Sequence, residues 1–318
     1  MDACIECLPN EILLEIFKYL DAELLFQAFY NLNSRFNSLL ESFDNCLTIP
    51  ANDPQKLKPF FPYIRSLIIK NRNNIPLYQL INLRRAVLHT ESGSLCGYFG
   101  INIKSNIEHL TILAPENRII IFYIQLAQNI FSDGFPHLKS LCFSPRTIFC
   151  GIEGWKQSSS LRILKVGWTK FIYYRAVLAS CPNLYSFEFW PDEDKDPTPS
   201  TEKHVNLKRM IVNLGIDRPL NQDRFDGYFS MVPKLEQLTI NLLLLNSDNI
   251  KFIEDHDWFA SAIDRYLPML HQFHCSVTLI DFVKISESEL DNLINKLKAK
   301  FERVHSNRYQ SMILIRSG

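Results

Sequence analysis

A six-residue pattern, apolar-x-x-apolar-x-apolar, recurs nine times and constrains the fold more than any other feature of the sequence. Its instances are Ile64–Ile69, Leu83–Leu88, Ile107–Ile112, Leu138–Phe143, Leu161–Val166, Leu184–Phe189, Leu207–Val212, Leu235–Ile240 and Leu270–Cys275. The first leucines of four consecutive instances, at positions 138, 161, 184 and 207, are each 23 residues apart. Alternate residues of a strand point to one face, so the last two apolar positions of each instance would turn inward together. The pattern therefore predicts stacked strands, because no single instance can cover its own apolar row.

A period of roughly 20–29 residues with this pattern resembles the leucine-rich repeat. The resemblance is to irregular repeats of this class and covers roughly residues 62–280, although the asparagine expected after the pattern is mostly absent. It implies an α/β fold in which residues 62–318 form a leucine-rich-repeat-like solenoid with parallel strands on its concave face. An unrelated α/β domain with a parallel sheet would also alternate strands and helices, but the 23-residue register argues against it.

The segments between the predicted strands are long enough for helices or irregular crossovers. The segments that we expect to be helical are Ile119–Phe131, Phe171–Ala179 and Trp258–Tyr266. The stretch Pro191–Lys203 has no helical period and is expected to be a loop. A last helix from about Ser286 to Val304, with Ser286 and Glu289 as a capping box, would precede a strand at Ser311–Ile315 and cover the open edge of the solenoid.

Ahead of the repeats, the stretch Leu8–Leu32 (LPNEILLEIFKYLDAELLFQAFYNL) has more apolar surface than one buried helix face needs. Pro9 suits the first position of a helix, and the apolar residues of that helix cover roughly 220° of a helical wheel, where a core-facing stripe needs about 100°. Asp21 is a candidate N-cap for a second helix and Asn33 or Ser34 for a third, which would bury Phe36, Leu39, Leu40 and Phe43. The surplus apolar surface either packs on the rest of the chain or forms a docking face for another protein.

A spaced set of residues runs through this segment: Leu8-Pro9, Glu11-Ile12-Leu13, Ile16-Phe17, Tyr19-Leu20-Asp21, Leu24-Leu25, Ala28, Arg35-Phe36 and Leu39. The spacing resembles an F-box, with residues 1–46 as the F-box and residues 47–61 as a linker to the solenoid. The resemblance implies that the helical unit binds a Skp-type adaptor and, through it, a cullin. The adaptor contacts that it implies are Leu8, Pro9, Ile12, Leu13, Ile16, Phe17, Leu20 and Leu24. Phe36 stands near the position where many F-boxes have tryptophan, a difference that concerns packing within the unit.

Charge is distributed unevenly along the 318 residues, although the formal net charge is +0. Residues 1–46 carry eight acidic and two basic residues, a net charge of −6, which leaves +6 for the remainder. Such a difference fits two modules with different partners, and the bases of the remainder are not clustered along the sequence, which makes nucleic acid an unlikely partner. The N-terminus has no basic, apolar secretory signal and the eight scattered cysteines suggest no disulfide framework, so we expect a cytoplasmic or nuclear protein without membrane contact.

Motifs for catalysis and metal binding are weak. Cys4-x-x-Cys7 has the spacing of half a zinc site, but the chain has no second such pair, and Cys275 of the His271-x-x-His274-Cys275 stretch would point inward. The sequence contains no glycine-rich phosphate loop and no Gly-x-Ser-x-Gly elbow. We therefore expect no cofactor, no metal and no enzymatic activity in this chain.

Outward strand positions would line the concave face of the predicted solenoid. They are Lys70, Arg85, His89, His109, Lys165, Glu188, Trp190, Arg209, Gln237, Thr239, Gln272 and His274. Exposed aromatic residues anchor interfaces, so Trp190 is the first candidate contact for a target protein, with Glu188, Arg209 and Lys165 beside it. Together with the F-box resemblance, this suggests a substrate-recognition subunit of an SCF-type ubiquitin ligase, and the alternative is a protein-interaction scaffold that acts without a ligase.

Overall fold

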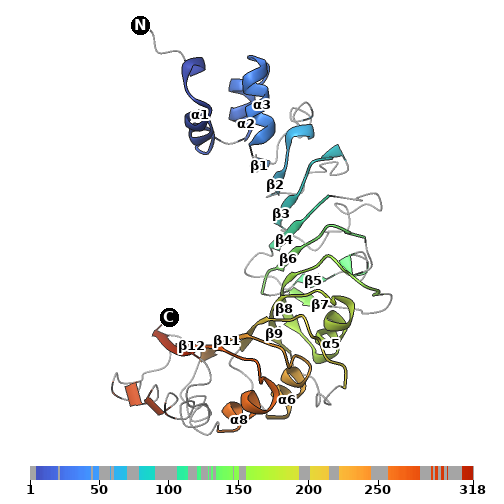
Figure 1. Cartoon of the computed structure of the whole chain (residues 1–318), viewed down its shortest axis with the longest axis vertical. Coiled ribbons are helices and arrows are strands. Elements are labelled where there is room, and N and C mark those ends of the chain that lie inside the picture. Colours follow the sequence, from blue (N-terminus) through green and yellow to red (C-terminus); the bar gives the residue numbers. More distant parts are fainter. Residues whose placement is uncertain are drawn as a thin grey trace.

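The structure is a computed structural model. It describes residues 5–20, 22–43, 46–49, 58, 61–69, 79–89, 106–113, 120–122, 128, 130–131, 134–145, 147–149, 155–192, 201–214, 222–244, 257–279, 288, 291–292, 295–296, 299 and 310–317. These residues form an arc with three short helices at its N-terminal end, followed by one curved sheet (Figure 1). The chain therefore has the predicted α/β class.

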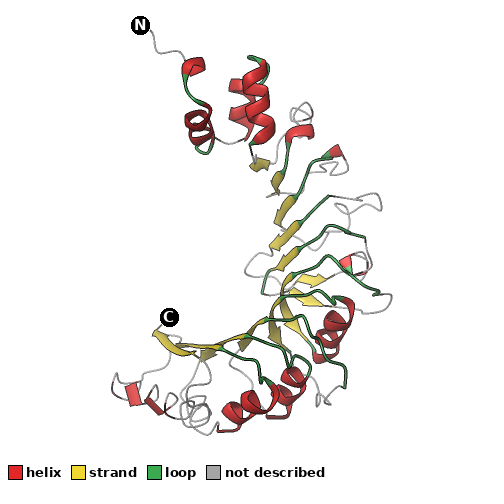
Figure 2. Ribbon diagram, in the orientation of Figure 1, coloured by secondary structure: helices red, strands yellow, loops and turns green. Residues whose placement is uncertain are grey.

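The sheet contains thirteen strands among the described residues, and every pairing between them is parallel. Eleven strands follow one another in chain order. They are β1 (Cys46–Ile49), β2 (Ser66–Ile69), β3 (Arg85–His89), β4 (His109–Leu113), β6 (Ser140–Phe143), β8 (Ile163–Thr169), β9 (Ser186–Pro191), β10 (Arg209–Leu214), β11 (Gln237–Leu244), β12 (Gln272–Leu279) and β13 (Gln310–Ser317). The strands line the inner side of the arc, and the helices between them lie on its outer side (Figure 2).

Strand register confirms the predicted stacking of the repeats. Leu141 pairs with Leu164, Leu164 with Phe187, and Phe187 with Met210, so the residues that occupy the same position in the 23-residue units lie side by side. All four side chains are buried, as are their counterparts Leu110 and Leu238 in the neighbouring strands. One continuous apolar column therefore runs along the convex side of the sheet, as expected when each unit buries its apolar row against the next.

Repeated hydrogen bonds hold the units together before each strand begins. The carbonyl of the residue in the second position of the pattern accepts two N–H groups of the next unit; Arg162 O, for example, accepts Tyr185 N at 2.8 Å and Ser186 N at 3.0 Å. Asparagines add side-chain bonds at the same level: Asn183 Nδ2 donates to Ser159 O at 2.8 Å, and Asn206 Nδ2 to Pro182 O at 2.8 Å. Asn82 and Asn106 form equivalent bonds earlier in the chain. The units are thus linked by asparagines that precede the pattern, whereas the expected asparagine position follows it.

Three helices cover the outer side of the later strands. They are α5 (Phe171–Ser180), α6 (Gln222–Ser230) and α8 (Asp257–Tyr266). Tyr174 of α5 is fully buried, its ring stacks on Phe187 at 5.7 Å between centroids, and its hydroxyl donates to Tyr228 O at 3.0 Å. Burial raises the pKa of Tyr174 well above its usual value, so this side chain works as a neutral donor that fixes α5 to α6.

Expected helices and observed elements agree in part. The helices expected at Phe171–Ala179 and Trp258–Tyr266 are confirmed by α5 and α8, and the strand expected at Ser311–Ile315 by β13, which pairs with β12. The expectation of a helix throughout Ile119–Phe131 is wrong, because Ile120–Phe122 forms β5, which pairs with β7 (Thr147–Phe149). Ser286 and Glu289, the expected capping box, lie outside the described residues, which include only scattered helical positions from 288 to 299.

The N-terminal unit consists of α1 (Asn10–Phe17), α2 (Ala22–Phe29) and α3 (Ser34–Ser42), after a short 3₁₀ turn at Ile5–Cys7. Pro9 lies one position before α1 rather than at its first residue, and its carbonyl accepts Leu13 N at 3.1 Å. Asn33 caps α3 as expected, because its side chain accepts Phe36 N at 3.0 Å. Phe17, Phe29 and Phe36 form its aromatic centre, with centroid distances of 5.0 Å between Phe17 and Phe29 and 5.3 Å between Phe29 and Phe36. The three helices therefore have a small core of their own.

Aromatic and polar contacts connect this unit to the sheet. Tyr63, just before β2, packs against Phe26 at 5.7 Å and Tyr30 at 5.6 Å between ring centroids. A hydrogen bond with Tyr30, together with burial, raises the pKa of Tyr63, and Arg65 donates to Glu41 O at 2.8 Å. Residues 46–49, which include the last residue of the expected F-box and the start of the expected linker, are strand β1 and pair with β2. Packing contacts and a hydrogen bond therefore join the helical unit to the sheet.

No helix among the described residues is long and apolar enough to cross a membrane. Apolar residues of the described ranges lie in the core between sheet and helices, and in a smaller exposed set described below.

Candidate functional site

Apolar side chains remain exposed on the N-terminal unit although it contacts the sheet. Ile12 of α1 is 47% exposed and Leu24 of α2 is 52% exposed, and Pro9 is also exposed. Three more exposed apolar residues belong to the same unit: Ile5, Tyr19 and Leu32. A unit this small rarely exposes so many large apolar residues to solvent. We call Ile5, Pro9, Ile12, Tyr19, Leu24 and Leu32 the apolar surface.

The structure divides the eight expected adaptor contacts into three groups. Pro9, Ile12 and Leu24 are exposed. Leu8, Ile16 and Leu20 are half-buried. Leu13 and Phe17 are fully buried within the unit, so in this conformation they support the shape of the surface rather than form part of it.

One arginine positions the start of the apolar surface. Arg35 of α3 donates from Nε to Asn10 Oδ1 at 2.8 Å and from one terminal nitrogen to Glu6 O at 2.6 Å. Its other terminal nitrogen donates to Leu8 O. These charge-assisted bonds hold the segment before α1 against α3, which fixes the places of Ile5 and Pro9.

A row of linked polar side chains crosses the concave face from β8 to β11. Lys165 Nζ lies 2.9 Å from Glu188 Oε1, and the same oxygen accepts Asn213 Nδ2 at 3.2 Å. Asn213 Oδ1 in turn accepts Asn241 Nδ2 at 2.7 Å. We call these four residues the polar ladder. Because each member is oriented by the next, the row presents a fixed arrangement of charge and hydrogen-bonding groups.

Trp190 lies beside the polar ladder, with Lys165 Nζ 6.0 Å from its ring centroid. The structure adds Trp168, which pairs with Trp190 across β8 and β9 because the register shifts between Lys165 and Trp168. Val166 and Gly167 are both buried there, as at a β-bulge, which re-aims the side chains that follow it. The sequence signal for this bulge is Gly167, because a glycine within a strand pattern often marks one.

The four expected target contacts do not all touch one another. Lys165, Glu188 and Trp190 lie together, whereas Arg209 is exposed on β10 opposite Ser186, nearer the start of the strands. Lys70 lies outside the described residues. The remaining expected positions, from Arg85 to His274, are exposed or half-buried as predicted for an outward row.

No protein-family model and no curated protein matches this chain. The apolar surface and the polar ladder are therefore the features from which a function can be inferred. The apolar surface and the polar ladder are built by different parts of the chain, at the N-terminal end of the arc and at its middle (Figure 1).

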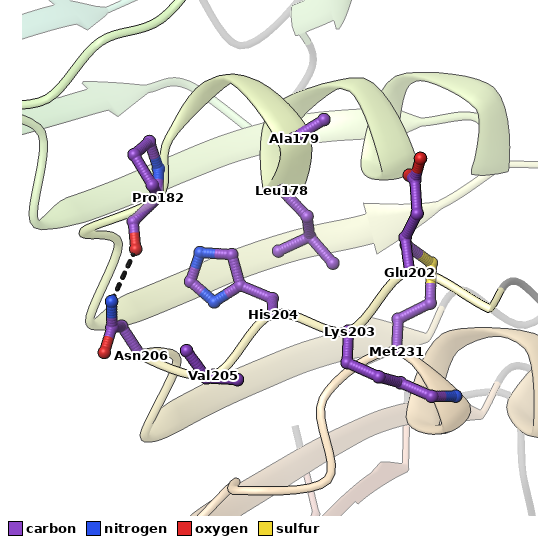
Figure 3. A pocket seen from close by; sticks show the side chains of 9 residues that line it. All are labelled: Leu178, Ala179, Pro182, Glu202, Lys203, His204, Val205, Asn206 and Met231. Carbon is purple, nitrogen blue, oxygen red and sulfur yellow. Dashed lines mark hydrogen bonds between the residues drawn. The ribbon is translucent and has the colours of Figure 1, made fainter.

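A pocket of about 320 Å³ lies between α5 and the segment that leads into β10. His204 is at its centre (Figure 3), but both ring nitrogens are used: Nδ1 accepts Leu207 N at 3.0 Å, and Nε2 lies 2.9 Å from Cys181 O. Lys203 donates to Ser230 O at 2.6 Å, and Asn206 to Pro182 O. His204, Lys203 and Asn206 of this pocket are thus engaged in hydrogen bonds that hold the fold.

Cysteines and metal ligands give no further site in the described part of the chain. No group of three or more His, Cys, Asp or Glu residues able to hold a metal occurs there. Cys275 is buried, and burial raises its pKa to about 12, while Cys4 lies outside the described residues. Burial, aided by Glu188, also raises the pKa of Cys142 despite the opposing effect of Lys165, so this thiol next to the polar ladder stays protonated at neutral pH.

Proposed function

We propose that this chain is a substrate-recognition subunit of an SCF-type ubiquitin ligase. Its N-terminal unit would be an F-box that binds a Skp-type adaptor, and its sheet a leucine-rich-repeat-like solenoid that binds a target protein. The chain itself would contribute no chemistry; it would raise the effective concentration of the target near the conjugating enzyme.

The observation that carries this proposal is the apolar surface. Ile12 and Leu24 stay about half exposed in a unit that has its own core and is already attached to the sheet. The simpler explanation is that the surplus apolar residues pack on the rest of the chain. Ile12 and Leu24 remain exposed, so this explanation does not account for all of them. The strand spacing of 23 residues and the chain-order parallel sheet support the second half of the proposal.

Target binding would use the polar ladder and the two tryptophans. Trp168 and Trp190 offer aromatic area at low entropic cost, and the Lys165–Glu188 pair offers both signs of charge beside it. The contacts between the N-terminal unit and the sheet would hold this face at a set distance from the adaptor, which suits a subunit that positions one protein relative to another.

The adaptor half is tested by co-expression of the full chain with a Skp-type adaptor. The wild-type chain should co-purify stoichiometrically, whereas Ile12→Asp and Leu24→Asp should each weaken binding by at least about tenfold, because a charge replaces an apolar contact. Ile172→Asp is the matched control: Ile172 is 52% exposed on α5, on the outer side of the sheet. Failure of the wild-type chain to bind, or an equal loss in the control, would contradict the proposal.

A further inference from the structure

Basic side chains gather along one edge of the sheet, where the strands begin. The second and third positions of the nine pattern instances carry seven bases: Arg65, Arg84, Arg85, Lys139, Arg162, Lys208 and Arg209. The same positions carry two acids, Glu108 and Glu236. Bases that are dispersed along the sequence therefore lie on successive units at one edge of the sheet. The repeat places residues 139, 162, 185 and 208 on adjacent units, and their backbones are directly hydrogen-bonded.

The two acids of this edge are already paired with bases. Glu108 lies between Arg84, at 2.8 Å, and Lys139, at 2.6 Å, and Glu236 lies 2.7 Å from Lys208. A hydrogen bond with Lys139 lowers the pKa of Glu108, and one with Lys208 lowers that of Glu236. Both carboxylates are thus ionised at neutral pH. Arg162 and Arg209 are exposed, and neither forms an ion pair with a carboxylate among the described residues.

Two exposed apolar residues lie in the middle of this basic row. Ile163 is 47% exposed and Tyr185 is 49% exposed, on the neighbouring strand starts of β8 and β9. Lys139 and Arg162 lie on one side of Tyr185 along the row, and Lys208 and Arg209 on the other. We call Lys139, Arg162, Ile163, Tyr185, Lys208 and Arg209 the basic edge.

We propose that the basic edge binds an extended segment of a target protein in which acidic residues flank an apolar side chain. The inference deepens the proposed function, on which it rests for naming the partner as a target. From the strand of Lys139 to that of Lys208 is three strand spacings, about 14 Å, which an extended segment of roughly four or five residues spans. Its carboxylates would face Arg162 and Arg209, the two bases of the edge that have no carboxylate partner among the described residues, and the apolar residue would cover Ile163 and Tyr185.

The observations favour a polypeptide over a nucleic acid. An exposed aliphatic residue such as Ile163 offers an aliphatic or aromatic side chain a contact that a sugar-phosphate backbone does not use. The carboxylates of Glu108 and Glu236 would also repel a continuous row of phosphates on either side of the basic edge. A polypeptide can place its acids beside Arg162 and Arg209 alone, and so avoid the two carboxylates that already pair with Lys139 and Lys208.

The test is fluorescence anisotropy of the full chain with a labelled nine-residue peptide that has one phenylalanine between pairs of glutamates. Binding tighter than about 1 mM should weaken as salt rises. It should fall at least about tenfold when glutamines replace the glutamates, when serine replaces the phenylalanine, and in the Arg209→Glu and Tyr185→Ser variants. Arg175→Glu is the matched control, since Arg175 is exposed on α5, away from the edge. Circular dichroism checks that each variant is folded, and Arg209→Gln replaces Arg209→Glu if it is not.

Several outcomes would overturn the inference. They are a lack of peptide binding, equal binding of the glutamine peptide, an equal loss in Arg175→Glu, and displacement of the peptide by a single-stranded oligonucleotide of the same charge at equal or lower concentration. Self-association of the chain that Arg209→Glu abolishes would assign the basic edge to a second copy instead. Adaptor co-purification is measured on the same variants. A chain that binds the adaptor but not the peptide would contradict this inference and leave the proposed adaptor binding standing.

Discussion

At the scale of single residues, His204 is the buried polar group with the most defined chemistry. Leu207 N donates to Nδ1, so the ring proton lies on Nε2, which donates to Cys181 O. Burial lowers the pKa of His204 below its ordinary value of 6.5, with the bond to Cys181 acting in the opposite direction. A neutral imidazole is therefore part of the folded state and joins two successive units.

This arrangement predicts a pH dependence of stability. The unfolded chain binds a proton at His204 near pH 6.5, before the folded chain does, so the free energy of unfolding should fall as the pH drops below that value and level off below the folded pKa. Urea unfolding from pH 8 to pH 5 measures this slope. His204→Gln should flatten it, whereas His271→Gln, at an exposed position, should leave it as it is; equal slopes in wild type and His204→Gln would contradict the prediction.

At the scale of elements, the strands depend on the apolar column that runs beneath them. Phe187 of β9 pairs with Leu164 and Met210 and stacks on Tyr174 of α5. Its ring thus contacts a strand on each side and the helix below, and no neighbouring side chain in the close-packed core can fill its place.

Phe187→Ala should therefore lower the free energy of unfolding by about 3–5 kcal/mol. Ile163→Ala on the adjacent strand is the control, because Ile163 is half exposed and should cost less than about 1 kcal/mol. Urea unfolding followed by circular dichroism measures both. A similar cost for the two substitutions would mean that the column does not determine the stability of the sheet.

Periodicity explains which elements the sequence could predict. The 23-residue register predicted the column from Leu141 to Met210, and compact apolar segments predicted α5 and α8. The helix predicted for the long apolar run at Ile119–Phe131 was wrong in part, because β5 forms within this run. A continuous apolar stretch fits a buried strand as well as a helix. Trp168 was missed because a bulge at Gly167 interrupts the alternation on which the outward positions were counted.

Surface residues were harder to predict for two physical reasons. A helical wheel shows that α1 is apolar on more than one side, but it cannot tell which side the unit itself covers, and Leu13 and Phe17 proved to be inside. Bases that are 23 residues apart in sequence look scattered, and only the stacking of the units places Arg162 and Lys208 on one edge. Both features depend on contacts between segments that are distant in sequence.

At the scale of the whole molecule, the contacts around Tyr63 determine whether the two parts of the chain move together. Tyr63 packs on Phe26 and Tyr30 of the N-terminal unit, while its own backbone leads directly into β2. Arg65 adds a bond from the sheet to the end of α3. The proposed function needs this junction to be stiff, because a subunit that positions a target loses precision if its two ends move independently.

Tyr63→Ala should weaken this junction by about 1–3 kcal/mol, since two aromatic pairs and a hydrogen bond are lost. Hydrogen–deuterium exchange of the full chain should then accelerate in residues 22–43 and stay unchanged in β9 and β10. Tyr185→Ala, at an exposed tyrosine of the sheet, serves as the control. Unchanged exchange in α2 and α3 would show that the helical unit is stable without the junction.

The bond pattern between units has a consequence for how long such a chain can become. The carbonyl of Arg162 accepts N–H groups of the next unit, just as the carbonyl of Lys139 accepts N–H groups of the unit that contains Arg162. Asn183 and Asn206 form the same kind of side-chain hydrogen bond 23 residues apart. A tandem duplication of residues 161–183 would therefore meet matching donors and acceptors at both of its seams. The arc would grow by one strand, about 5 Å. A duplication of this kind would enlarge the area available to a partner without any further substitution.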